Sequence, residues 1–209
     1  LSITTGISNT LVGSLAGDAL TDADFNVVMG LGSLSADTLG SKSVAIGTAA
    51  LQAQNFTTAT DTYNTAVGHN AGNDVTTGIR STLIGGLAGD AITSANYNVA
   101  VGYSSLSAET LGSKSTALGY LSLTAQNFTT ATDVYNVAVG YSAGGSVTTG
   151  VRNTIIGALA ADALNTGSDN TALGYNALTA DTKGNTSVAI GFAALGSQNF
   201  TSATDAHNV

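Results

Sequence analysis

The stretch Asn64-Thr65-Ala66-Val67-Gly68 contains the pattern from which the whole chain is built. An Asn or Ser, a Thr or Val, a small or aliphatic residue and an aliphatic residue precede a glycine, called here the motif glycine. The motif glycines are Gly13, Gly30, Gly47, Gly68, Gly85, Gly102, Gly119, Gly140, Gly157, Gly174 and Gly191. They are spaced by 17, 17, 17 and 21 residues in turn, so that four units form a super-repeat of 72 residues. Such a period is typical of solenoids and fibres, in which each unit buries its apolar surface against its neighbours.

Each motif predicts a short β-strand, because it is rich in β-branched residues and ends in a glycine. Side chains alternate along a strand, so the Thr or Val and the aliphatic residue share one face. The middle residue, an Ala in seven units, faces the other side. We expect the aliphatic face to fill the interior of a coil, and the alanine column to lie outside, open to a second chain. A helix is disfavoured, because each regular glycine costs about 1 kcal/mol in a helix interior.

Two further columns mark the corners of each unit. Three residues after the motif glycine the residue is always Ala or Ser, which indicates a second short strand or a tight bend. A glycine column seven residues before the motif glycine predicts a turn with positive φ. Its members are Gly6, Gly40, Gly78, Gly112, Gly150, Gly167 and Gly184. We therefore expect an all-β coil in which residues 1–209 form one continuous array of eleven rungs of 17 or 21 residues, about 50 Å long.

The composition argues against several classes of function. The chain has five Lys and Arg against thirteen Asp and Glu, and a net charge of −8, so nucleic-acid binding is not expected. No apolar run is long enough for a helix that enters a membrane. The absence of Cys excludes disulfides and thiolate metal sites. Lys42, Arg80, Lys114 and Arg152 each lie five residues before a motif glycine and are interpreted as solvated rows.

The four extra residues of every fourth unit provide the first candidate for a binding feature. These inserts fall within residues 54–61, 126–133 and 198–205, and insertions of this kind loop out on one face of an array. Phe56, Phe128 and Phe200 in the inserts could be apolar surface contacts, or could pack over the coil or against a neighbouring chain. Each belongs to an Asn-Phe-Thr sequence that matches the acceptor pattern for N-glycosylation.

A row of aromatic residues provides the second candidate. Tyr103, Tyr120, Tyr141 and Tyr175 directly follow a motif glycine. Exposed aromatic rows can stack on sugar rings; alternatively, these rings cover the strands or line a contact between chains. The acids also recur in rows, but the dense Asp-Gly consensus of calcium-binding β-rolls is missing, so turn caps and solubilising acids are expected. We expect no metal site, no cofactor and no enzyme activity, because an active site needs distinct residues and these positions repeat.

The phrases at residues 64–72, 170–178 and 187–191 resemble two related sets of repeats. One is the YadA-like head of trimeric autotransporter adhesins, and the other is the Asn-Thr-Ala-Val-Gly-Tyr-Asn-Ala-Leu repeat of phage tail fibres. The resemblance covers the whole chain and implies a left-handed parallel β-roll, or β-solenoid, assembled as an intertwined or side-by-side homotrimer. The rungs of the adhesin heads are shorter, so the spacing of this chain is more similar to that of the phage fibres.

We therefore expect a structural shaft segment of a trimeric extracellular fibre. It would belong to a phage or phage-like tail fibre whose distal tip contacts a glycan or protein of the host-cell surface. The alternative is a bacterial trimeric autotransporter adhesin whose head or stalk binds host matrix or glycan. An ice-binding solenoid is a third class, disfavoured because its Thr column is interrupted by Val and is expected to point inward. Both ends of the chain fall inside a unit, so we expect a window of a longer fibre.

Overall fold

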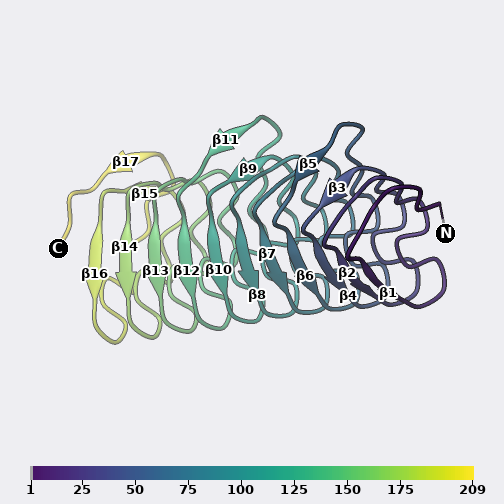
Figure 1. The fold of residues 1–209 in the computed structure, drawn as a ribbon. Coiled ribbons are helices and arrows are strands. Elements are labelled where there is room, and N and C mark those ends of the chain that lie inside the picture. Colours follow the sequence, from purple (N-terminus) through teal and green to yellow (C-terminus); the bar gives the residue numbers. More distant parts are fainter. Residues whose placement is uncertain (1) are drawn as a thin grey trace.

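The computed structural model describes residues 2–209 and shows an all-β parallel solenoid (Figure 1). Short strands, one from each unit, form an eleven-stranded sheet that runs the length of the molecule. Its strands are β1 (Thr10–Val12), β2 (Val27–Met29), β4 (Val44–Ile46), β6 (Thr65–Val67), β7 (Thr82–Ile84), β8 (Val99–Val101), β10 (Thr116–Leu118), β12 (Val137–Val139), β13 (Thr154–Ile156), β14 (Thr171–Leu173) and β16 (Val188–Ile190). Within the described range the chain forms no helix, and so none that could span a membrane.

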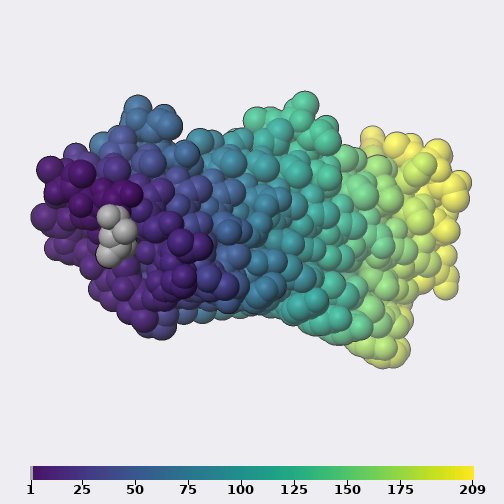
Figure 2. Space-filling view, turned by 90° about the vertical axis from the view of Figure 1, so that its right-hand side faces the viewer, coloured from purple at the N-terminus to yellow at the C-terminus, as the bar shows by residue number. Residues whose placement is uncertain are grey.

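Three pairs of two-residue strands lie beside the inserts. They are β3 (Gly40–Ser41) with β5 (Thr60–Asp61), β9 (Gly112–Ser113) with β11 (Thr132–Asp133), and β15 (Gly184–Asn185) with β17 (Thr204–Asp205). The segments that lead into β5 and β11 project from the same side of the stack in Figure 1. Figure 2 shows them as blue and teal protrusions along one edge of the molecule. The inserts therefore leave the coil on one side, as predicted.

Equivalent repeat positions pair with one another in the sheet. Thr10 pairs with Val27 of the next rung, and Val44 pairs with Thr65 across the first insert. All neighbouring strands of the large sheet are parallel. Each repeat position therefore becomes a column of side chains along the solenoid. The prediction that the motif forms a strand of an all-β solenoid is confirmed.

The inside and the outside of the coil are the reverse of the prediction. The middle strand residues point inward, and Ala66, Ala100 and Ala117 are all 0% exposed. The aliphatic residues point outward, and Val12 and Ile190 are 50% and 63% exposed. The Thr column lies on the same outward face, so the expectation that it points inward was also wrong. The alanine column belongs to the interior and is closed to a second chain.

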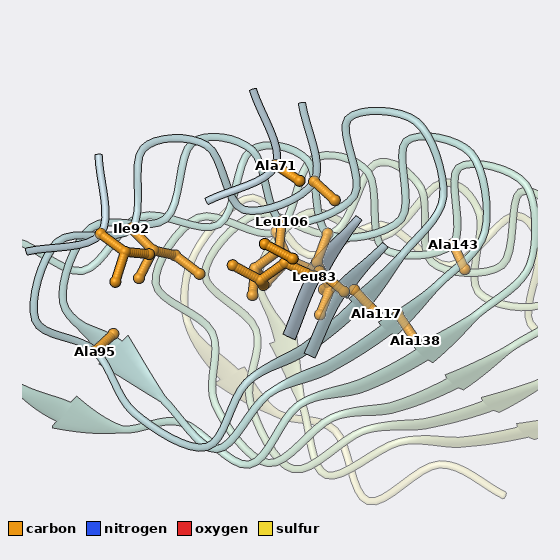
Figure 3. Packing of buried hydrophobic residues seen from close by; sticks show 14 of the residues in the cluster. Ala71, Leu83, Ile92, Ala95, Leu106, Ala117, Ala138 and Ala143 are labelled. Carbon is orange, nitrogen blue, oxygen red and sulfur yellow. The ribbon is translucent and has the colours of Figure 1, made fainter. Parts of the chain in front are cut away.

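The reason for this reversal is that the turn following each strand supplies the large core side chains. Where the middle strand residue is Ala117, the turn carries Leu123, which is fully buried. Where the strand carries Leu83, the turn carries Gly89, and a Cβ at Gly89 would lie 2.8 Å from the Leu83 side chain. Figure 3 shows Leu83 and Ala117 pointing into the same interior as Leu106, which comes from a turn. A narrow coil has limited room, so a Leu at the strand position leaves space only for glycine at the turn position four residues after the motif glycine, as at Leu83 and Gly89.

Asparagines four residues before the motif glycine, all buried except the half-buried Asn9, stabilise the corner that precedes seven of the eleven strands. The Oδ1 atom of Asn98 accepts a hydrogen bond from the N–H of Ser115 at 2.9 Å, and its Nδ2 donates to the carbonyl of Gly112 at 2.8 Å. The same two bonds are made by Asn9, Asn26, Asn64, Asn136, Asn153 and Asn170. The residue before each strand asparagine has a positive φ. The amide side chains therefore supply hydrogen-bond partners for backbone groups at this corner. Without the amides, these backbone groups would be buried without partners.

The second glycine column does not have the positive φ that the sequence predicted. These glycines are needed for space. A Cβ at Gly112 would lie 2.5 Å from the carboxylate of Glu109, and a Cβ at Gly78 would collide with the carbonyl oxygen of Ala95 in the next rung. The prediction was wrong about the conformation because a glycine that permits close approach has the same sequence signature as a glycine in a turn.

The motif glycine is required both by its backbone conformation and by its close contact with the next rung. Gly85 has a φ of +130°, and a Cβ there would lie 2.6 Å from the carbonyl oxygen of Gly102. Gly191 has a φ of +124° but no atom within 4 Å of a Cβ. We expect Gly191→Ala to lose only the backbone term of about 1–3 kcal/mol, and Gly85→Ala to lose more. Urea denaturation followed by circular dichroism measures both changes, and equal losses would contradict the importance of the inter-rung contact.

Candidate interaction surface

The outward side of the eleven-stranded sheet carries nearly all of the exposed large apolar side chains. Apart from Ile7, Leu15 and Val209, those of the described residues lie in four columns. Two columns are the outward residues of the strands. The leading column consists of the residues five positions before each motif glycine. The trailing column consists of the residues directly after each motif glycine. These four columns are called here the outer face.

Three of the four columns carry no charge. Neither strand column contains Asp, Glu, Lys or Arg, and the trailing column contains none either, although the chain has thirteen acidic and five basic residues. Eleven strands about 4.8 Å apart make this face about 50 Å long. Monomeric soluble proteins rarely expose a contiguous apolar patch of more than a few hundred Å². The outer face is therefore the candidate functional site.

The predicted tyrosine row lies on this face as the trailing column. Tyr103, Tyr120, Tyr141 and Tyr175 are between 46% and 54% exposed. The ring centroids of Tyr103 and Tyr120 are 5.8 Å apart, and those of Tyr120 and Tyr141 are 5.4 Å apart, in stacked geometry. Tyr175 stacks in the same way on Phe192, at 5.6 Å. Because the rings stack along the solenoid, their faces are turned toward each other and their edges are left for contact with another molecule.

The leading column alternates cations with aromatic rings, which the sequence analysis missed. Lys42 Nζ lies 5.2 Å from the Tyr63 ring centroid, the Arg80 guanidinium 5.6 Å from that of Tyr97, and Lys114 Nζ 5.2 Å from that of Tyr135. These are cation–π distances. The interpretation of the cations as solvated rows is replaced by a single mixed column. The signal was in the sequence, since the units between those with cations carry an aromatic residue at the same position.

Carboxylates pair with the cations of the leading column. Lys42 Nζ lies 2.5 Å from Asp61 Oδ2, and Lys114 Nζ lies 2.6 Å from Asp133 Oδ2. The hydrogen bond from Lys42 holds the pKa of Asp61 below its ordinary value, and the same bond raises the pKa of Lys42. Asp61 and Asp133 end the short strands β5 and β11, which form the last residues of the first two insert ranges. The inserts therefore supply the acids that pair with the two lysines of the leading column, whereas Arg152 pairs with Asp169 of the same column.

The phenylalanines of the inserts are not part of the outer face. Phe56 and Phe128 are only 8% exposed, and Phe200 is partly buried. Their rings pack against the coil, which was the second of the alternatives that the sequence left open. Little of either buried ring remains for a surface contact.

A buried carboxylate fixes each insert. Asp37 Oδ1 accepts hydrogen bonds from the N–H groups of Phe56 at 3.0 Å and Gly40 at 3.1 Å, and its Oδ2 accepts one from Gln54 Nε2 at 2.6 Å. Glu109 and Asp181 repeat this arrangement at the other inserts. Burial raises the pKa of Asp37, and the hydrogen bonds oppose that shift in part. This row of acids therefore caps turns, as expected, and in residues 2–209 no cluster of His, Cys, Asp and Glu could hold a metal ion.

Asp37→Ala is expected to open the first insert. It leaves the N–H groups of Phe56 and Gly40 and the amide of Gln54 without an acceptor, and each unsatisfied buried donor costs about 1–3 kcal/mol. Limited digestion with a broad-specificity protease, followed by mass spectrometry, should show faster cleavage in this insert and unchanged cleavage in the second. Asp61→Ala is the control in the same insert, because it removes an exposed ion pair only. Equal cleavage of the two variants would contradict the capping role.

Asp61 and Asp37 are expected to titrate on opposite sides of the ordinary value of 3.8. The pKa of Asp61 is lowered, so its stabilising contribution is complete above 3.8 and is lost as the pH falls. The pKa of Asp37 is raised, so the folded chain binds this proton more readily than the unfolded chain, and its contribution is lost as the pH rises above 3.8. Carboxyl ¹³C NMR, assigned with Asp37→Asn and Asp61→Asn, measures both midpoints. A midpoint for Asp61 above that of Asp37 would overturn the assignment.

No protein-family model, curated protein sequence or solved structure matches this chain. A solenoid fold by itself does not imply a function. The function is therefore argued from the repeat and from the outer face.

Proposed function

We propose that this chain is a structural shaft segment of a homotrimeric extracellular fibre, in which three solenoids lie side by side around a common axis. The observation that carries this proposal is the outer face, which bears nearly all of the exposed large apolar side chains and runs along the whole sheet. Three copies that turn this face toward the axis remove it from water. In this proposal the coil is left-handed and is built from rungs of 17 and 21 residues.

The dimensions of the outer face suit a stable interface. It is about 50 Å long, and the seven residues from the leading to the trailing column span at most about 20 Å. The product is about 1,000 Å² for each chain, against about 800 Å² for each partner in a standard protein interface. Stable interfaces are depleted of charge in their centre and enriched in Tyr, Met and Arg. The outer face has this composition, with Met29 in a strand column and tyrosines at both margins.

The proposed role is mechanical. Parallel strands bond to one another along the solenoid, so the backbone hydrogen bonds lie along the fibre and resist its extension and bending. Three-fold symmetry presents three copies of any group at the end of the fibre, which raises avidity for a host-cell glycan or protein. The resemblance to phage tail-fibre repeats supports a place on a virion involved in host attachment. A bacterial surface adhesin is the alternative that the same resemblance supports.

Ice binding gains one observation from the structure. The Thr column points outward and not inward, which removes one argument against that function. The column is still interrupted, since Val replaces Thr in five of the eleven units. Thermal hysteresis of the purified chain is the measurement that would support this second candidate over the fibre.

The purified chain is expected to have a solution mass three times its chain mass of 20.5 kDa, measured by sedimentation equilibrium. Val139→Lys places a charge on the outer face and should shift the mass toward that of one chain. Thr149→Lys, at an exposed position in the following turn, is the matched control and should leave the trimer intact. A single-chain mass for the unmodified protein would contradict the proposal.

A further inference from the structure

The leading and trailing columns are related in the rungs that carry arginine. In each rung the two residues are separated by the strand and the motif glycine, so they lie at opposite margins of the outer face. The pairs, leading residue first, are Ser8 and Ser14, Phe25 and Leu31, Lys42 and Thr48, Tyr63 and His69, Arg80 and Gly86, Tyr97 and Tyr103, Lys114 and Tyr120, Tyr135 and Tyr141, Arg152 and Ala158, Asp169 and Tyr175, and Thr186 and Phe192. No rung places two charged residues at the two margins.

Where the leading residue is arginine, a long leading side chain shares its rung with a very small trailing residue. Arg80 shares its rung with Gly86, and Arg152 shares its rung with Ala158. These are the two smallest residues of the trailing column. The tyrosines of the leading column, in contrast, all share a rung with His or Tyr.

Nothing within the chain requires a glycine at position 86. Its φ is not positive, and a Cβ there would have the Tyr103 ring as its nearest neighbour at 3.4 Å, which is close to an ordinary contact. A larger ring at this position would extend the stack of Tyr103 and Tyr120. Among residues 2–209, no hydrogen bond, aromatic stack or cation–π contact joins a leading to a trailing residue. Contacts of these kinds therefore provide no cause within one chain for the small trailing residues in the rungs of Arg80 and Arg152.

A three-fold axis supplies that cause. Rotation about an axis parallel to the solenoid produces a heterologous contact, in which one margin of a chain meets the other margin of its neighbour. A pure rotation also keeps each rung at the same height. We propose that the copies pack parallel and in register, with the leading column of each chain against the trailing column of the next, rung by rung. This inference rests on the proposed trimer and states which residues form its contacts.

The charges of the leading column suit burial at such a contact. Lys42, Lys114 and Arg152 are paired with carboxylates of their own chain. The Arg80 guanidinium lies against the Tyr97 ring and donates a hydrogen bond from Nη1 to its hydroxyl at 2.7 Å. The trailing column brings no charge of its own. The contact therefore adds no like-charge repulsion, and it gives the arginine side chains a neighbour with the space to hold them.

Gly86→Tyr tests the contact directly. Tyrosine is accepted at the trailing position in other rungs, so the variant should fold, which its circular dichroism verifies. The added ring fills the space that the partner chain's arginine would occupy, and overpacking of this kind weakens association. We expect the protein concentration at which half of the trimer dissociates, measured by sedimentation, to rise by about tenfold or more. A Gly86→Tyr trimer as stable as the parent trimer would overturn the inference.

A second substitution tests the register. Arg80→Ser in the Gly86→Tyr chain restores space in the same rung, with the residue that Ser8 supplies in the first rung, and should recover most of the lost association. Arg152→Ser in the Gly86→Tyr chain is the matched control, because it creates the same space four rungs away, and it should recover none. Equal recovery by the two would overturn the in-register contact while leaving the trimer in place. A parent chain that is monomeric would instead defeat the proposed function together with this inference.

Discussion

The structure depends on the close approach of successive rungs at the motif glycine. The backbone at Gly85 has a φ of +130°, and a Cβ there would lie 2.6 Å from the carbonyl oxygen of Gly102. No other residue allows the chain to adopt this conformation while the next rung passes so near. Because this contact recurs at one repeat position, it sets the register of the whole stack. Every other repeat position then forms a column, and a property of one residue becomes a property of a line along the molecule.

The fold could be predicted from the sequence to the level of the strand and the coil, but not to the level of inside and outside. Alternation along a three-residue strand defines two faces and does not say which one is buried. The decision rests on the turn, which sends a Leu such as Leu123 into the core opposite an alanine such as Ala117. The sequence contained the evidence for this decision. One rung has a small strand residue with a large turn residue, and another has a large strand residue, Leu83, with a small turn residue, Gly89. Recognising it requires knowing which turn residue points inward, and this depends on the left-handed backbone of the turns.

Only part of the candidate site was predicted from the sequence, because contacts between units are not visible within one unit. The tyrosine row was found because its members share one neighbour, the motif glycine. The cations and tyrosines of the leading column alternate from unit to unit, so each type taken alone looks sparse, and only stacking brings Lys42 against Tyr63. The insert phenylalanines could not be placed from the sequence, because their burial depends on a carboxylate from an earlier rung, as Asp37 shows for Phe56. Contacts between units are set by three-dimensional register, which is not visible in any single unit.

The pairing of long leading with small trailing side chains follows from the same logic when the fibre is taken as a trimer of identical chains. A change at a leading position is then presented to the trailing position of the same rung in the neighbouring chain, three times over. The two margins must change together, although they do not touch within one chain. The pairing of Arg80 with Gly86 and of Arg152 with Ala158, one super-repeat apart, is the pattern that this constraint would preserve. In a lone solenoid no contact between the two margins would favour the smallest trailing residues in the rungs that carry the longest leading side chains.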